Sequence, residues 1–185
     1  MRAVPITVTA LAATLLLTAC GGGDDSGSAG DGKSKATDSA SAAGAAGSAC
    51  AAGDLSPEVG PVDAAPAAGD TGNVTVTLLN KGAECTLNGF PTVSLQADGT
   101  SATVAKDAAA EAQPLTLPAQ GTASFTITYV RGAGSGDKSL AVKTVKYGLP
   151  SASADESFPW SYGDVALKSA DVPDATVSAF QQAGD

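Results

Sequence analysis

The sequence predicts an all-β protein: an immunoglobulin-like antiparallel β-sandwich of about seven to nine short strands, preceded by a signal peptide and a disordered linker. Three observations predict this organisation. From Cys50 onward, short runs alternate apolar and polar residues with a period of two, and turn residues separate the runs. Residues 1–20 form an apolar leader, and residues 21–49 contain no aromatic or branched aliphatic side chain.

The leader, residues 1–20, has the parts of a lipoprotein signal peptide. Arg2 supplies a positive charge, an apolar run extends to Leu17, and small residues precede Cys20. The run is shorter than the ~20 apolar residues that span a bilayer. Because the segment Leu17-Thr18-Ala19-Cys20 is similar to a bacterial lipobox, we expect Cys20 to carry the lipid and to anchor the chain on the outer face of the cell membrane. The alternative is an ordinary signal peptide cut elsewhere, or a buried apolar segment.

The linker, residues 21–49, is rich in Gly, Ala and Ser. Such a segment buries too little apolar surface to offset the entropy of ordering, so we expect a disordered tether. As a flexible coil it would reach roughly 30 Å. The folded domain is then expected to span residues 50–185.

The strand pattern begins with residues 74–78, whose apolar members share one face. Residues 93–95 lead into Asp98-Gly99, a favoured two-residue hairpin turn. Around this turn Val93 is expected opposite Val104, and Leu95 opposite Ala102, so that the hairpin has a common apolar face.

The remaining strands follow from the same alternation. Residues 115–117 lie between two prolines and are expected to form an edge strand. Residues 123–129 are the longest alternating run and are expected to be central. Residues 140–142 and 165–167 are shorter alternating runs and are expected to form short strands. Residues 171–182 are expected to form a short C-terminal helix that Asp171 caps.

An aromatic segment near the C-terminus offers two interpretations. Phe158, Trp160 and Tyr162 alternate with other residues, so they share one face of an extended chain. They are expected to close one end of the sandwich core. The alternative is an exposed platform that binds a sugar ring or a partner protein. Pro159 excludes a central-strand position, which is compatible with either interpretation.

The cysteines and the charge limit the function further. The chain has 3 Cys, no His, and a net charge of −9. If Cys20 is lipidated, Cys50 and Cys85 remain as a pair in an oxidising compartment and are expected to form a disulfide; the alternative is two free buried thiols. The negative charge disfavours nucleic-acid binding. The lack of His and of any metal-ligand spacing predicts no cofactor and no metal site.

Several of these residues resemble a known family. The matching elements are Cys50, the strand 74–80, the segment Cys85-Thr86-Leu87-Asn88-Gly89-Phe90-Pro91, and the turn 117–123. They are similar to the actinobacterial family called domain of unknown function 4232, which occurs in secreted proteins and lipoproteins. Leu87, Gly89, Phe90 and Pro91 carry the motif. Members often have a second cysteine pair, which this chain lacks. The resemblance implies an envelope-facing β-sandwich and assigns no activity.

Together these observations predict a non-enzymatic lipoprotein of the cell envelope, whose sandwich domain binds or interacts with a partner. The membrane, through Cys20, is one expected partner, and an envelope protein or a glycan is another. The first alternative is a solute- or glycan-binding lipoprotein that uses residues 158–162. The second is an enzyme, which the absence of His and of any nucleophile-and-base pair disfavours.

Overall fold

The computed structural model describes residues 47–183, except 135, 137 and 151. Strands are the dominant secondary structure of these residues, which confirms the all-β prediction; a 3₁₀ turn, η1 (Ala52–Asp54), is the one helical element among them. No helix in this part of the chain is long and apolar enough to cross a membrane. The predicted signal peptide, Cys20 and the linker up to residue 46 lie outside the described residues.

The larger of two stacked sheets has six strands. Its centre is β2 (Thr71–Asn80) beside β8 (Thr122–Val130), and β1 (Leu55–Asp63) forms the edge next to β2. On the other side of β8 lie β14 (Ala175–Val177) and β15 (Gln181–Gln182). β6 (Ala105–Lys106) completes the sheet as the parallel neighbour of β14, whereas the other pairs are antiparallel. We call this the large sheet.

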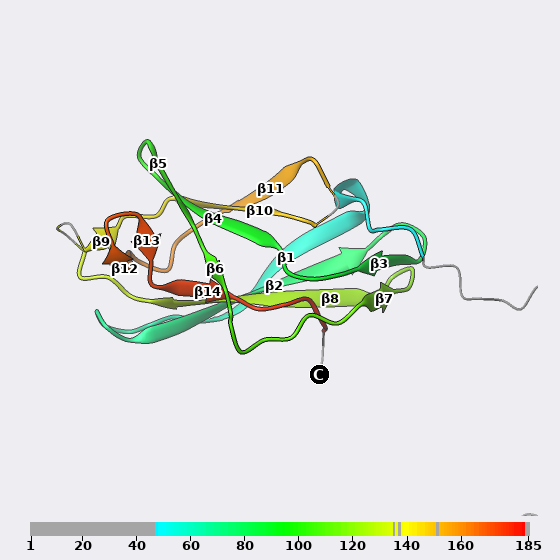
Figure 1. Ribbon diagram of the computed structural model, residues 1–185, viewed down its shortest axis with the longest axis horizontal. Coiled ribbons are helices and arrows are strands. Elements are labelled where there is room, and N and C mark those ends of the chain that lie inside the picture. The colour runs from blue at the N-terminus through cyan, green and yellow to red at the C-terminus, as the bar shows by residue number, and fades with distance from the viewer. Residues whose placement is uncertain (1–46, 135, 137, 151, 184–185) are drawn as a thin grey trace, which may run out of the picture. The chain divides into compact units, whose positions relative to one another are not determined.

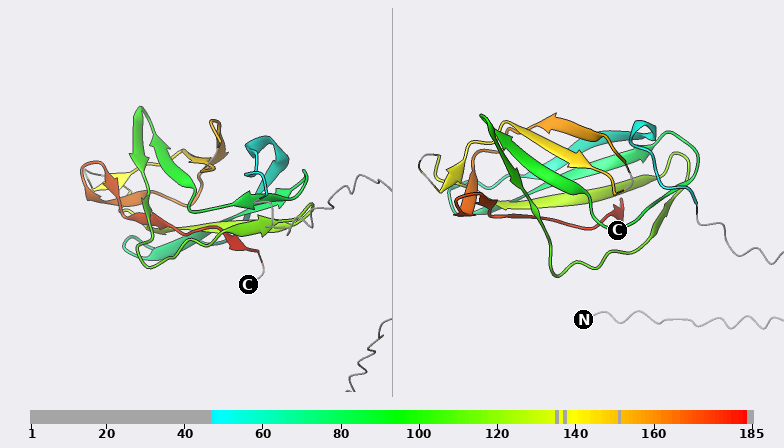
Figure 2. Two further views of the ribbon diagram at one scale, coloured as in Figure 1. Left: turned by 45° about the vertical axis from the view of Figure 1, so that its right-hand side comes forward. Right: turned by 45° about the horizontal axis from the view of Figure 1, so that its top comes forward.

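The second sheet, the four-stranded sheet, packs over the first. Its strand order is β11 (Asp155–Pro159), β10 (Thr144–Gly148), β4 (Thr92–Ala97) and β5 (Thr100–Thr103). Figures 1 and 2 show the two layers, with β4, β10 and β11 on one side and β2, β8 and β14 on the other. This is the sandwich-like arrangement that the alternation predicts.

Two small sheets lie at the ends of the sandwich. The first contains β13 (Val172–Pro173), β12 (Val165–Ser169) and β9 (Ser139–Leu140), and the second pairs β3 (Cys85–Leu87) with β7 (Leu115–Leu117). They lie at opposite ends of the sandwich (Figure 1). β7 has β3 as its neighbour within its sheet, so the edge position expected between the two prolines is confirmed.

The hydrophobic core lies between the two main sheets. Alternate residues of β2 and β8 point into it and are fully buried, and alternate residues of β4 and β10 meet them from the opposite sheet. The apolar members with the lowest exposure from these four strands are Val74, Val76, Leu78, Ala123, Phe125, Ile127, Tyr129, Leu95 and Val145. The period-two pattern therefore identified the inward face correctly, and β8 is central as expected.

The predicted β4–β5 hairpin has the expected register. Leu95 pairs with Ala102, and the Val104 amide donates to the Val93 carbonyl at 2.9 Å. Gly99 in the turn has φ of 79°, a conformation that glycine adopts without steric cost.

Three expectations need correction. The helix expected over residues 171–182 is wrong: this stretch forms β13, β14 and β15, and the β14 backbone pairs with β8. Alternating burial of Ala175 and Val177, with a β-branched residue between them, suits a strand better than a helix. The described residues contain fifteen strands rather than seven to nine, because two-residue segments such as β6 and β15 have no alternation to reveal them.

The third correction concerns the end of the linker. Residues 47–49, expected to be disordered, already pair with β3. The Thr86 amide donates to the Ser48 carbonyl at 2.9 Å, and the Thr86 hydroxyl donates to the Gly47 carbonyl at 3.0 Å. These bonds use backbone carbonyls of the linker, so its lack of apolar side chains did not prevent ordering.

Candidate functional site

A disulfide joins the start of the domain to β3. Cys50 and Cys85 are bonded, with 4.9 Å between their Cα atoms, and both side chains are buried. The bridge closes a loop of 35 residues, which stabilises the fold by about 3–4 kcal/mol in the chain-entropy model. The predicted disulfide is confirmed, and the chain enters the sandwich at this end.

The four motif residues lie where the chain leaves β3 and enters the four-stranded sheet. Leu87 and Pro91 are buried, and Gly89 has φ of 95°, which disfavours any residue with a Cβ. Phe90 is half-buried, with the Lys106 ammonium 5.3 Å from its ring centroid. The motif therefore forms the connection from the small β3–β7 sheet to the four-stranded sheet.

Asn80, at the end of β2, holds two connections together at the same end. Its side chain is fully buried, and its Nδ2 lies 2.8 Å from the Ala83 carbonyl, 3.1 Å from that of Leu117 and 3.0 Å from that of Pro118. Its Oδ1 accepts from the Gly82 amide at 2.9 Å. The sequence analysis did not single out this residue, because a lone Asn at a strand end is typical of a turn.

These structural residues fall within a match to a known family. Residues 50–181 match the family model described as domain of unknown function (DUF4232). The chain belongs to the DUF4232 family. The sequence has no significant match among curated proteins. In this DUF4232 domain the matched segment includes the disulfide, the motif and both main sheets.

Two of the three rings in the aromatic segment of the DUF4232 domain lie in the core rather than on the surface. Phe158 and Trp160 are 8% and 6% exposed, and the Trp160 ring packs edge-on against Tyr129 and Tyr162 at 4.9 Å and 4.8 Å between centroids. The Trp160 indole N–H donates to the Gly163 carbonyl at 2.7 Å. The core interpretation is correct for Phe158 and Trp160, and Tyr162 is half-exposed and packs against the core. The exposed-platform interpretation is wrong for Phe158 and Trp160. Pro159 lies on the edge strand β11, as expected.

These aromatic side chains support the loops at the end of the sandwich that lies away from the disulfide. The Tyr129 hydroxyl donates to the Tyr162 carbonyl at 2.9 Å, and the Arg131 guanidinium donates to the Ala65 carbonyl at 2.7 Å. Burial raises the pKa of Tyr129, so its hydroxyl stays protonated as a donor. Side chains at the end of β8 thus bond to the carbonyls of two loops, which fixes the loops in place.

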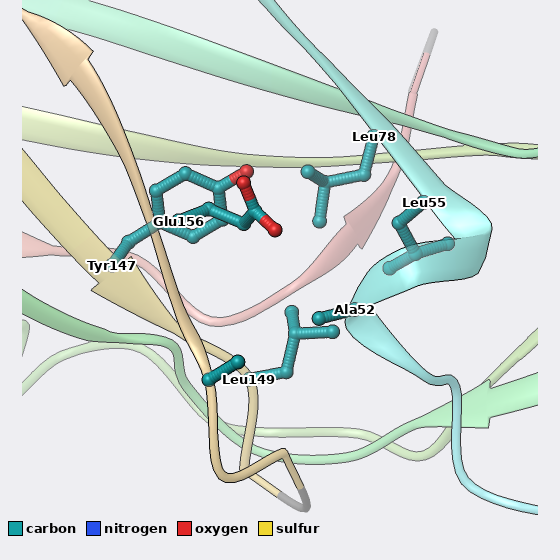
Figure 3. A pocket seen from close by; sticks show the side chains of 7 residues that line it. Ala52, Leu55, Leu78, Tyr147, Leu149 and Glu156 are labelled. Carbon is teal, nitrogen blue, oxygen red and sulfur yellow. The ribbon is translucent and has the colours of Figure 1, made fainter.

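A narrow cleft opens between the two sheets beside η1. Figure 3 shows Leu55 and Leu78 on one side, and the hydroxyl of Tyr147 with the carboxylate of Glu156 on the other. Burial, and secondarily the negative charge of Glu156, raises the pKa of Tyr147 to about 12. The space between these side chains is too narrow to admit a water molecule, so the cleft belongs to the packed core rather than to a ligand site.

Two wider hollows lie on the outer face of the four-stranded sheet. The first, about 280 Å³, is lined by residues that include Thr92, Ser94, Thr103, Lys146 and Asp155. The second, about 380 Å³, is lined by residues that include Gln96, Asp98, Ser101 and Lys143. We call the two together the polar trough.

The register of β4 with β5 and with β10 places side chains of the polar trough in adjacent rows across the strands. Ser94 pairs with Thr103 on one side and with Lys146 on the other, and Gln96 in the next row pairs with Ser101. None of these residues was singled out from the sequence. Among the described residues, no group of three His, Cys, Asp or Glu side chains is placed to hold a metal ion.

Proposed function

We propose that this DUF4232 protein is an exported lipoprotein, anchored through Cys20 to the outer face of the cell membrane, and that its sandwich is a binding module rather than an enzyme. The observation that carries the proposal is the Cys50–Cys85 disulfide. Disulfides persist in oxidising compartments, which supports export. The bridge also uses two of the 3 Cys, so Cys20, at the end of the apolar leader, is the cysteine that remains for the lipid.

The case against catalysis rests on the chemistry of the side chains. The chain has no His, and the two tyrosines with shifted pKa values are both shifted upward, toward the unreactive protonated form. Lys146 and Asp155 are exposed, without the burial that tunes acids and bases in active sites. These features support binding as the function.

The anchor is tested by metabolic labelling with a fatty-acid analogue, followed by membrane fractionation. We expect the protein to be labelled and found with membranes, and Cys20→Ala to lose both properties. The matched control is the double variant Cys50→Ala/Cys85→Ala, which removes the other two cysteines and should keep the label. A Cys20→Ala protein that still carries the label would contradict the proposal.

A further inference from the structure

We propose that the polar trough on the four-stranded sheet binds a neutral, linear glycan. The inference gives a ligand class to the binding module proposed above and therefore rests on that function. It places the ligand on β4, β5, β10 and β11, and not on the aromatic rings of residues 158–162.

The hydrogen-bonding groups of the trough match those of a sugar. A sugar hydroxyl both donates and accepts, so a site needs both kinds of partner. Gln96 Nε2 donates to the Ser94 hydroxyl at 3.0 Å and to the Ser101 hydroxyl at 2.7 Å. Both serine oxygens accept from Gln96, so each O–H group can rotate to donate to a ligand.

A second set of groups gathers around Gly148, in the row next to Lys146. A Cβ at Gly148 would lie 2.7 Å from both Thr92 Oγ1 and Asp155 Oδ1. The hydroxyl and the carboxylate therefore converge over a backbone position that has no side chain of its own. Lys146, two residues earlier on the same face of β10, adds an exposed ammonium donor.

The charges of the trough select a neutral ligand. Each hollow holds one lysine and one aspartate: Lys146 with Asp155, and Lys143 with Asp98. None of these four forms an ion pair with a described residue, and the two lysines cancel the two aspartates. With a net charge of −9 on the whole chain, a polyanion gains no electrostatic attraction here.

The shape and polarity of the face favour a glycan over a protein partner. The cores of protein interfaces are rich in aromatic and apolar anchors. Val172, which lies outside the trough, is the one large hydrophobic residue with high exposure among the described residues. The two hollows occupy adjacent rows roughly 7 Å apart along the strands, so a linear ligand can contact both.

The test is isothermal titration of the full chain in detergent with three oligosaccharide probes of equal length: chitohexaose, maltohexaose and an oligogalacturonate. We expect at least one neutral probe to bind and the anionic probe not to bind. Thr103→Val and Lys146→Ala should each weaken binding by about fivefold or more, since each removes a hydrogen bond to the ligand.

The controls make the same changes outside the trough. Thr77→Val alters the outer face of the large sheet, and Lys81→Ala alters an exposed lysine beyond β2; both should bind like the unaltered chain. The proposal is overturned if neither neutral probe binds at millimolar concentration, if only the anionic probe binds, or if the controls weaken binding as much as the trough variants. Because the purified chain is titrated, loss of the membrane anchor would not affect this result.

Discussion

Asn80→Asp is a nearly isosteric change that should severely destabilise this domain. The substitution keeps the shape of the side chain and its acceptor for the Gly82 amide, but it replaces the Nδ2 donor with an oxygen. That oxygen would lie near 3 Å from the carbonyl oxygens of Ala83, Leu117 and Pro118. The domain would lose donors to buried carbonyls and would gain an unpaired charge at a fully buried position.

The expected magnitude follows from these losses. Each lost hydrogen bond costs about 1 kcal/mol, and an uncompensated buried charge costs about 3–5 kcal/mol. We therefore expect Asn80→Asp to lower the free energy of unfolding by about 4 kcal/mol or more near neutral pH. That is a large part of the roughly 5–15 kcal/mol available to a domain.

The assay is urea unfolding followed by Trp160 fluorescence, with Asn73→Asp as the matched control. Asn73 lies on the same strand, half-exposed, and its Oδ1 accepts from the Thr128 hydroxyl, a bond that a carboxylate keeps. Burial should raise the folded-state pKa of the carboxyl introduced by Asn80→Asp above its unfolded value of about 3.9. The destabilisation should therefore be smallest below that pH and grow as the pH rises. Equal unfolding midpoints for the two variants at pH 7 would refute the reasoning.

Two further predictions concern buried aromatic residues. Trp160→Ala should cost about 3–5 kcal/mol, measured by thermal unfolding, because it removes a buried ring and its bond to Gly163. Tyr162→Ala, at a half-exposed ring, is the control and should cost less; a red-shifted native Trp emission would contradict the buried position. Tyr147 has a folded-state pKa of about 12 against an ordinary value of 10.0, so its protonated form adds stability that is complete below pH 10 and is lost as the pH rises toward 12. Tyr147→Phe should flatten the fall in unfolding free energy over that window, by on the order of 2 kcal/mol; an unchanged pH profile would show that Tyr147 does not titrate there.

The sequence predicted the strands in which apolar and polar residues alternate. It missed the short strands that are recognised only by their backbone hydrogen bonds. β2 and β8 were expected because each places branched or aromatic residues on one face. The β4–β5 register followed from Asp98-Gly99, because a two-residue turn fixes which residues face each other. β6 and β15 have two residues each, too few to show a period, and their pairing partners are distant in sequence.

The error over residues 171–182 has the same origin. Asp171 is a favourable N-cap, and the spacing of Val177 and Phe180 suits one face of a helix. Both side chains are indeed buried, but β14 gains backbone hydrogen bonds by lying along β8. Tertiary pairing therefore overrode a local signal that was compatible with either structure.

The polar trough could not be predicted from the sequence, although its chemistry is entirely in the side chains. Thr92, Lys146 and Asp155 are ordinary polar residues in the sequence, where Thr and Ser are common on the solvent face of any strand. They become neighbours because β10 lies between β4 and β11, a placement that the order of the chain does not give. The aromatic segment gave the stronger sequence signal for a sugar site, and the structure uses the rings of Phe158 and Trp160 to fill the core. In a domain with few large side chains, the core takes most of the aromatic rings, so we expect recognition at the surface to depend on hydroxyl, amide and charged groups.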